Sequence, residues 1–233
     1  MNPIPGSVES YARLVGPEPD GVLAEMEAKA EREGFPTVGP AVGGWLRFLA
    51  GLVDARRVFE FGSGFGYSAY WFAGVLPEDG EVVLTEIDAD ELEAARGFLE
   101  RGGHADRARF EHGDAVEIVE RYDGPFDCVL IDNEKERYAE AFEAVRGKVP
   151  AGGLVLADNA VAAGPIEFEA LPELLSDADV ETTEATRGIA EYLRMIRADP
   201  AFETVLLPVG EGVAASRRLP DPRPRGDRCS KNH

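Results

Sequence analysis

Acidic and amide side chains follow five short apolar runs of this chain, and together they could form one reactive site. The side chains at the ends of the runs are, in order, Glu60, Glu86, Asp114, Asp132 and the pair Asp158-Asn159. Helix capping by carboxylates explains any one of them, but it does not easily explain all five after otherwise apolar runs. Ligands of an open parallel sheet bind at the carboxyl ends of its strands. We therefore expect these side chains to line one site.

The first run leads into a glycine-rich turn, FEFGSGFGYS, at residues 59–68. Its G-x-G-x-G spacing differs from the G-x-G-x-x-G of dinucleotide-binding turns. Glu60 before the turn and Ser68 after it favour a ligand with an amino group over one with a pyrophosphate. Glu86, 24 residues beyond Gly62, suits ribose hydroxyls, although dinucleotide enzymes share that feature. With Asp114 as an acceptor for an adenine amino group, the set fits S-adenosylmethionine.

The last two runs end in oxygen ligands. Asp132, Asp158 and Asn159 suit magnesium or a similar hard cation, because such ions prefer oxygen donors and keep bound water. Lys135 follows Asp132 by about one helical turn, so its amine can reach the same place. A metal ion and partial burial both disfavour the charged form of an amine. Lys135 is therefore predicted to be a general base, and the alternative is a surface ion pair with a neighbouring glutamate.

Composition limits the kind of protein this is. A chain of 233 residues with 44% hydrophobic residues suits one large α/β domain. The net charge of -20 and the presence of only four lysines favour a protein adapted to concentrated salt, and an ordinary acidic protein is the alternative. The acidity argues against binding a nucleic acid by charge alone, although a local contact with RNA remains possible.

The termini and cysteines point to a cytoplasmic protein. The first residues lack a signal-peptide pattern, and no apolar run is long enough to span a membrane. Cys128 and Cys229 provide neither a disulfide framework nor zinc-site spacing, and Cys128 is expected in the core. Residues 1–219 are expected to form a single domain with a helical N-terminal region. Residues 220–233 are expected to be a disordered basic tail.

The apolar runs alternate with helical patterns. The runs typical of strands cover residues 57–62, 81–88, 108–114, 126–133 and 153–159. Residues 160–186 read as a long loop with one short helix, and residues 202–219 read as a β-hairpin around GEG. Strands that alternate with helices predict a mostly parallel sheet covered on both faces.

These motifs resemble the metal-dependent class I O-methyltransferases of the catechol and caffeoyl-coenzyme A type. The resemblance covers about residues 35–218 and rests on FEFGSGFGYS, TEID, GDA, IDNEKERY and LADN. It implies a Rossmann-like three-layer sandwich with a seven-stranded, mostly parallel sheet whose last strand is antiparallel. It implies cofactor contacts from Val38, Gly62, Ser68, Glu86, Gly113, Asp114 and Ala115. It further implies magnesium on Asp132, Asp158 and Asn159, with Lys135 as the base. We also count Glu60 and Asp132 among the cofactor-binding residues.

The resemblance leaves the acceptor open. A small catechol-like hydroxyl compound is the first expectation, and a hydroxylated tRNA uridine is the alternative within the same chemistry. A non-catalytic nucleotide-binding module or an NAD-dependent oxidoreductase is the alternative of another class. Asn133, and the small residues at 160–164, depart from the family pattern and predict a differently shaped acceptor pocket. The family often forms homodimers, so a homodimer is expected here too.

Overall fold

A computed structural model describes residues 3–220 of the chain, and the predicted basic tail lies almost wholly outside the described residues. The seven strands found there are β1 (Arg57–Phe61), β2 (Glu81–Glu86), β3 (Ala108–His112), β4 (Cys128–Ile131), β5 (Leu154–Ala157), β6 (Phe202–Leu207) and β7 (Val213–Arg218). They form one sheet in the order β3-β2-β1-β4-β5-β7-β6. The last strand, β7, runs opposite to the other six described strands, as predicted.

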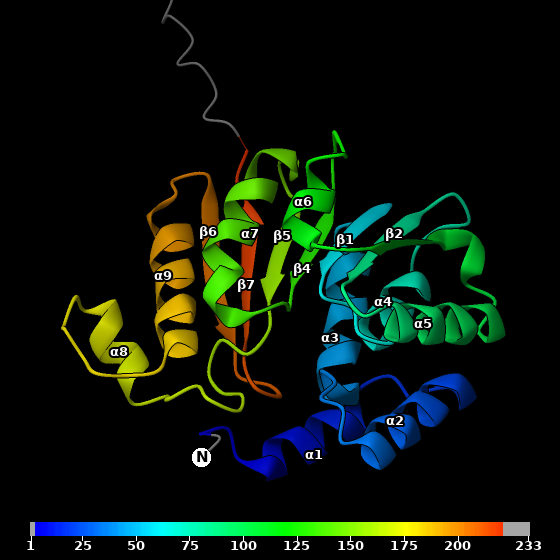
Figure 1. Cartoon of the computed structure of the whole chain (residues 1–233), viewed down its shortest axis with the longest axis horizontal. Helices are drawn as coiled ribbons and strands as arrows, with labels where there is room; N and C mark the ends of the chain where they lie inside the picture. Colours follow the sequence, from blue (N-terminus) through cyan, green and yellow to red (C-terminus); the bar gives the residue numbers. More distant parts are fainter. Residues whose placement is uncertain (1–2, 221–233) are drawn as a thin grey trace, which may run out of the picture.

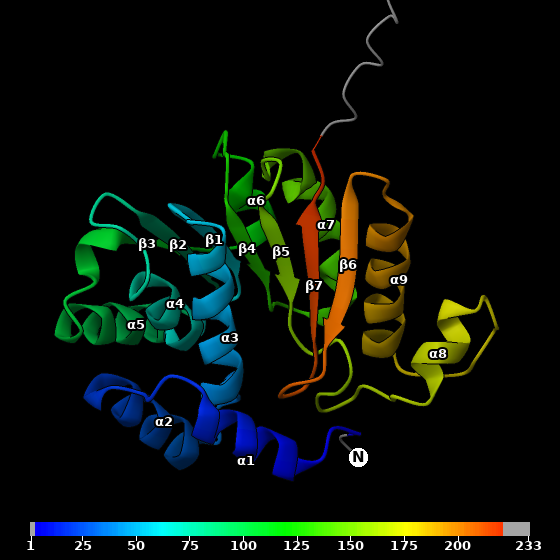
Figure 2. The same cartoon turned by 180° about the vertical axis from the view of Figure 1, so that it is seen from behind.

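Helices cover both faces of this sheet, so the molecule is a three-layer sandwich (Figures 1 and 2). One face carries α3 (Gly39–Leu52), α4 (Tyr67–Ala73) and α5 (Ala89–Arg101). The opposite face carries α6 (Ala115–Val119), α7 (Tyr138–Val145) and α9 (Glu184–Ala198), and α8 (Ala170–Leu175) packs against α9 beyond the edge of the sheet. Alternate strand residues supply both cores, since Val58 packs on one face and Phe59 on the other. The strands are therefore apolar on both sides, as parallel strands are.

Two further helices, α1 (Gly6–Val15) and α2 (Gly21–Glu33), lie across the edge at which β4 and β5 end (Figures 1 and 2). Asp20 caps α2 by accepting hydrogen bonds from the backbone amides of Val22 and Leu23. Gly34 ends the helix in the left-handed region, with φ of 65°. The chain then turns back toward the sheet through residues 35–38, which become one wall of the site.

The predicted strands are all present, but each is shorter than predicted. Each strand ends one or two residues before the predicted boundary, because the polar residues at its end already belong to the loop. The loop at 160–186 contains one short helix, α8, and Cys128 is fully buried. Within the described residues no helix is long and apolar enough to cross a membrane.

Candidate active site

A cavity of about 580 Å³ opens at the carboxyl edge of the sheet. The loops after β1, β2, β3, β4 and β5 all contribute to its wall, together with residues 35–38 and the β6–β7 turn. The predicted site residues on this wall are Val38, Gly62, Ser68, Glu86, Gly113, Asp114, Ala115, Asp132, Lys135, Asp158 and Asn159. The structure therefore brings together every predicted site residue except Glu60.

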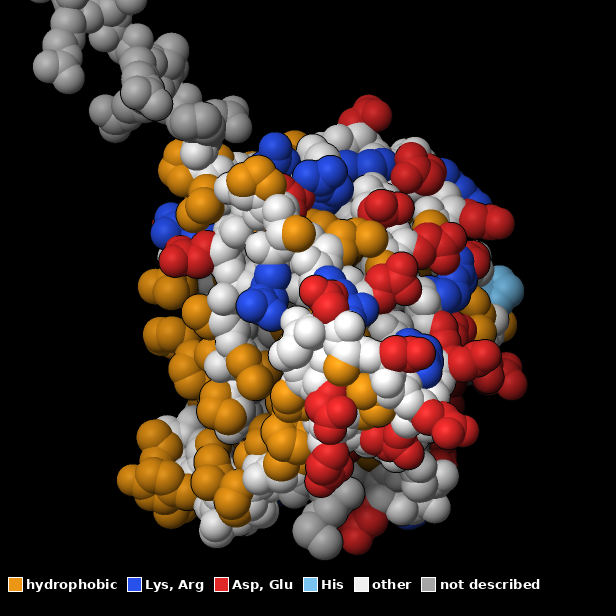
Figure 3. Space-filling model, turned by 90° about the vertical axis from the view of Figure 1, so that its left-hand side faces the viewer, with side chains coloured by type: hydrophobic (Ala, Val, Ile, Leu, Met, Phe, Trp, Pro, Cys, Tyr) orange, Lys and Arg blue, Asp and Glu red, His pale blue; other side chains and the backbone are white. Residues whose placement is uncertain are grey.

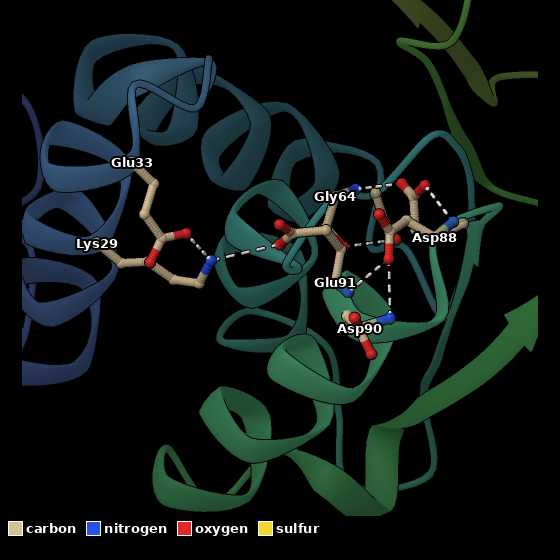
Figure 4. Close-up of polar contacts among 8 residues, drawn as sticks. Lys29, Glu33, Gly64, Asp88, Asp90 and Glu91 are labelled. Carbon is tan, nitrogen blue, oxygen red and sulfur yellow. Dashed lines mark hydrogen bonds and ion pairs between the residues drawn. The ribbon is translucent and has the colours of Figure 1, made fainter.

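The glycine-rich turn is held against two neighbouring loops. Gly62 has φ of 79°, and a Cβ atom there would lie 2.7 Å from the carbonyl oxygen of Asp132, so only glycine fits. The amide of Gly64 donates to Glu86 Oε2 at 2.8 Å, and the amide of Asp88 donates to Glu86 Oε1 at 3.0 Å (Figure 4). Glu86 thus fixes the turn while its carboxylate faces the cavity.

Glu60 requires a correction. Its side chain has no exposed surface and is absent from the cavity wall, because it lies in β1 beneath the turn. Ser68 donates its hydroxyl to Glu60 Oε1, while Glu60 Oε2 has no hydrogen-bond partner. Burial raises the pKa of Glu60 to about 8; the bond from Ser68 opposes this shift, and Asp132 and Glu86 add to it. Glu60 therefore reaches the cavity only through Ser68.

Asp114 forms hydrogen bonds within the protein that its predicted role as an acceptor for adenine does not require. Its Oδ1 accepts from the amide of Val116 at 2.9 Å and caps α6, and its Oδ2 accepts from Arg137 at 2.7 Å. The hydrogen bond from Arg137 is the main reason why the pKa of Asp114 is lowered. Arg137 also donates to Glu140 at 2.7 Å. Both oxygens of Asp114 thus have partners before any ligand is added.

Lys135 lines the part of the cavity that lies at the ends of β4 and β5. Its Nζ donates to Asp132 Oδ1 at 3.0 Å, to the carbonyl oxygen of Asn133 at 3.1 Å and to the hydroxyl of Tyr138 at 3.0 Å. Both partners of the ion pair are partly buried, so Lys135 does not form the exposed pair with Glu134 or Glu136 that was the alternative. The ammonium form satisfies all three oxygens.

Asp158 and Asn159 face the same space from the end of β5. Asp158 is only 4% exposed, and its Oδ1 has no hydrogen-bond partner. Burial raises the pKa of Asp158 well above its usual value, and the nearby charge of Asp132 raises it further. Burial also raises the pKa of Asp132, while Lys135 opposes that shift. A buried and a partly buried carboxylate that repel each other favour a cation between them.

Asn159 is oriented by a residue that the sequence did not reveal. Its Nδ2 donates to Glu211 Oε2 at 2.6 Å, so its side-chain oxygen is left for another partner. The carbonyl oxygen of Glu211 accepts from the amides of Val161 at 3.0 Å and Ala162 at 2.9 Å. The β6–β7 turn therefore holds the loop that carries Asn159. Since β6 runs parallel to β5, that turn falls at the same edge of the sheet.

The donor set fits a hard divalent cation. Asp132, Asp158 and Asn159 supply oxygen atoms, and the unpartnered Oδ1 of Asp158 is an open ligand position. Across residues 3–220, no three or more His, Cys, Asp and Glu side chains cluster in a way that could hold a metal ion. This set has two carboxylates and one amide, so it leaves room for water or substrate oxygens.

Comparison with known proteins settles the family. A family model of O-methyltransferases matches residues 20–219. The chain belongs to this O-methyltransferase family. A catechol O-methyltransferase of Niastella koreensis is 33% identical over 215 residues, covering 88% of this chain and 91% of that protein. Caffeoyl-CoA O-methyltransferase 2 of Petunia hybrida is 27% identical, covering 87% of this chain and 84% of that protein.

Solved structures support the same family and its cofactor. An O-methyltransferase from Bacillus cereus in complex with SAH has a TM-score of 0.77 at 25% identity, covering 91% of this chain and 97% of that one. The O-methyltransferase TomG from Streptomyces achromogenes, in complex with SAM, has a TM-score of 0.77 at 26% identity, covering 92% and 96%. This protein is therefore an S-adenosylmethionine-dependent O-methyltransferase, and the alternatives of an NAD-dependent oxidoreductase and a non-catalytic module were wrong.

Proposed function

We propose that this O-methyltransferase methylates a hydroxyl group of a small catechol-like acceptor and that it uses magnesium or a similar divalent cation. The observation that carries the proposal is the cluster at the ends of β4 and β5. Lys135 Nζ lies 3.0 Å from Asp132 Oδ1, and the buried Asp158 Oδ1 next to them has no partner. Asp132, Asp158 and Asn159 would hold the metal. When bound, it would polarise two adjacent acceptor oxygens and ease loss of the reacting proton.

S-adenosylmethionine would occupy the half of the cavity that the first three strand ends form. Glu86 would accept hydrogen bonds from the ribose hydroxyls, while Gly113, Asp114 and Ala115 would line the adenine. Val38, Gly62, Ser68 and Asp132 would surround the methionine end. Because the amide of Gly64 already fixes Glu86 at 2.8 Å, the carboxylate is oriented before the cofactor binds. Such preorganisation lowers the entropic cost of binding.

Lys135 would act as the base. It takes the proton from the acceptor hydroxyl, the oxygen bonds to the methyl carbon, and the carbon–sulfur bond breaks to leave S-adenosylhomocysteine. The resulting ammonium donates to Asp132, the carbonyl oxygen of Asn133 and Tyr138, so the three contacts stabilise the protonated product. Tyr138 is fully buried and therefore holds the amine from the core side.

The charges of the cavity wall favour a small acceptor without phosphates. Lys135 and Arg137 are its two basic residues, and each already pairs with a carboxylate of the site. Glu211 adds a further carboxylate beside Asn159. An acceptor such as a coenzyme A thioester or a tRNA would bring several negative charges close to this wall, with no uncommitted basic side chain on it to meet them.

An acceptor screen tests this proposal. The protein is incubated with S-adenosylmethionine and magnesium chloride at high salt, and release of S-adenosylhomocysteine is measured for each acceptor. A neutral catechol should be methylated, while a matched monohydroxy phenol should react far more slowly because it lacks the second oxygen. Faster turnover with a caffeoyl-coenzyme A ester or with tRNA carrying hydroxyuridine would overturn the assignment of the acceptor.

A further inference from the structure

Residues 35–38 form one wall of the cavity, and this wall depends on α2, which is not part of the sheet sandwich. The segment directly after α2, residues 35–38, lines the cavity, and the amide of Phe35 donates to the carbonyl oxygen of Ala30 at 3.0 Å. The position of this wall is therefore set by how α2 is fastened to the rest of the molecule.

Phe35 meets the glycine-rich turn through an aromatic contact. Its ring lies edge-on to the ring of Phe65, with centroids 5.1 Å apart. Gly64 makes room for it, since a Cβ atom at Gly64 would lie 2.7 Å from Phe35 Cζ. Phe35, Gly64 and Phe65 all line the cavity. The wall and the turn thus form one packed unit.

Lys29 contacts this packed unit through the ring of Phe65. Its Nζ lies 4.7 Å from the centroid of the Phe65 ring, which is a cation–π distance. The same atom pairs with Glu33 of its own helix and lies 3.5 Å from Glu91 Oε2 on α5 (Figure 4). The side chain of Lys29 is only 16% exposed, so the pair is partly shielded from solvent.

The contact at Glu91 leads directly to the cofactor loop. Glu91 Oε2 is buried and has no hydrogen-bond partner. Within the described residues, Lys29 is the basic side chain that forms an ion pair with it. The backbone amide of Glu91 donates to Asp88, which caps α5, and the amide of Asp88 in turn donates to Glu86 (Figure 4). Lys29 therefore connects α2 with Phe65 on one side and with the loop of Glu86 on the other.

We infer that Lys29 is a positioning residue for S-adenosylmethionine, which it helps to hold by locking α2 and Phe35 over the cofactor half of the cavity. Lys29 does not line the cavity and acts through Phe65 and Glu91. This inference rests on the proposed placement of the cofactor. It predicts an effect on cofactor affinity and none on the methyl-transfer step.

The test compares Lys29→Met with Arg96→Met. Arg96 is a matched control, because its guanidinium lies 4.3 Å from the centroid of the Phe110 ring and 3.5 Å from Glu93, away from the cavity. Calorimetry with S-adenosylhomocysteine should show that Lys29→Met raises Kd about five- to tenfold, from the loss of one cation–π contact and one shielded ion pair. KM for S-adenosylmethionine should rise equally, and kcat at saturation should stay unchanged.

Four further variants make the outcome decisive. Lys29→Arg should restore most of the affinity, because the positive charge over Phe65 and beside Glu91 is kept. Glu91→Gln should weaken S-adenosylhomocysteine binding as Lys29→Met does. The double variant Lys29→Met/Glu91→Gln should lose less binding free energy than the sum of the losses in the two single variants. Glu86→Ala should weaken binding strongly, because it removes the proposed ribose contact itself.

The pattern of losses separates the two claims. Wild-type affinity in Lys29→Met, equal losses in Lys29→Met and Arg96→Met, or a fall in kcat with unchanged KM would each overturn the role of Lys29. Normal affinity in Glu86→Ala would overturn the placement of the cofactor and the role of Lys29 with it. A loss in Glu86→Ala alone would leave the cofactor site standing and refute only the inference on Lys29.

Discussion

Glu60 shows how a buried carboxyl group near the site affects the whole protein. Its carboxyl group lies in the middle of β1, touches the hydroxyl of Ser68 and has one oxygen without a partner. Burial raises its pKa to about 8, so folding favours its protonated form. The folded state then holds a proton that the unfolded state loses above its ordinary pKa of 4.5. Stability from this group is thus full below pH 4.5 and falls as the pH rises to about 8.

Glu60→Gln should remove this pH dependence. Because glutamine does not titrate, the free energy of unfolding of Glu60→Gln relative to wild type should increase between pH 5 and pH 8, by at most about 4 kcal/mol. Urea unfolding at several pH values measures this difference. A difference that stays constant over the range would show that the carboxyl group does not titrate with folding.

At the scale of elements, α9 packs against the backbone of Lys135, the proposed base. A Cβ atom at Gly188 would lie 2.3 Å from the carbonyl oxygen of Lys135 and 2.6 Å from the Cα atom of Glu136. The backbone of α9 therefore packs directly on the 3-10 helix of residues 135–137. Any side chain at position 188 must move that turn or the helix.

Gly188→Ala should therefore impair catalysis without removing a reactive group. A displacement of Lys135 by about 1 Å should lower kcat roughly 100-fold, and overpacking should cost about 1–3 kcal/mol of stability. Gly97→Ala on the surface of α5 is the control, because its nearest atom is a flexible arginine nitrogen at 3.5 Å and the change should be neutral or slightly stabilising. Equal turnover of both variants would contradict the packing argument.

The sequence predicted the sheet and most of the site because the two follow one rule. Apolar runs end in polar residues, and parallel strands bring those ends together, so Asp132 and Asp158 could be placed near each other without a structure. The role of Glu211 was not predicted from the sequence, because a glutamate between two glycines is typical of a turn. Its role depends on which edge of the sheet the turn meets. Glu60 was misjudged because spacing along the chain cannot show whether a strand residue faces the cavity or the core.

At the scale of the whole molecule, the chain carries a large excess of negative charge. Figure 3 shows acidic side chains spread over the right-hand part of one face, and the net charge of the chain is -20. Self-repulsion of this size destabilises the folded state and is screened by salt, since the Debye length falls from about 10 Å at 0.1 M to about 3 Å at 1 M.

The unfolding temperature should therefore rise by several degrees as potassium chloride increases from 0.1 to 2 M, with the steepest rise at the lower concentrations. Differential scanning fluorimetry measures the curve, and sucrose is the control for effects without charge. A flat or falling curve would contradict the salt-adapted interpretation, which stays a prediction until then.

The expected homodimer also stays a prediction. Trp45, Phe48 and Leu52 on α3 keep exposed apolar surface. Burial of such side chains in a partner would stabilise a dimer. Sedimentation velocity at high salt measures the state of association, and Phe48→Asp should shift a dimer toward monomer. A monomer for the wild-type protein at micromolar concentration would refute the prediction.

The most direct test of metal-dependent methyl transfer follows one reaction in two proteins. S-adenosylhomocysteine release from a catechol acceptor is measured for wild type and Asp158→Ala, with magnesium or with a chelator, and S-adenosylhomocysteine affinity is measured in parallel. Wild type should require magnesium, and Asp158→Ala should lose turnover in both conditions while it keeps its affinity. Wild-type turnover that survives the chelator, or an Asp158→Ala variant that is still stimulated by magnesium, would contradict the metal site.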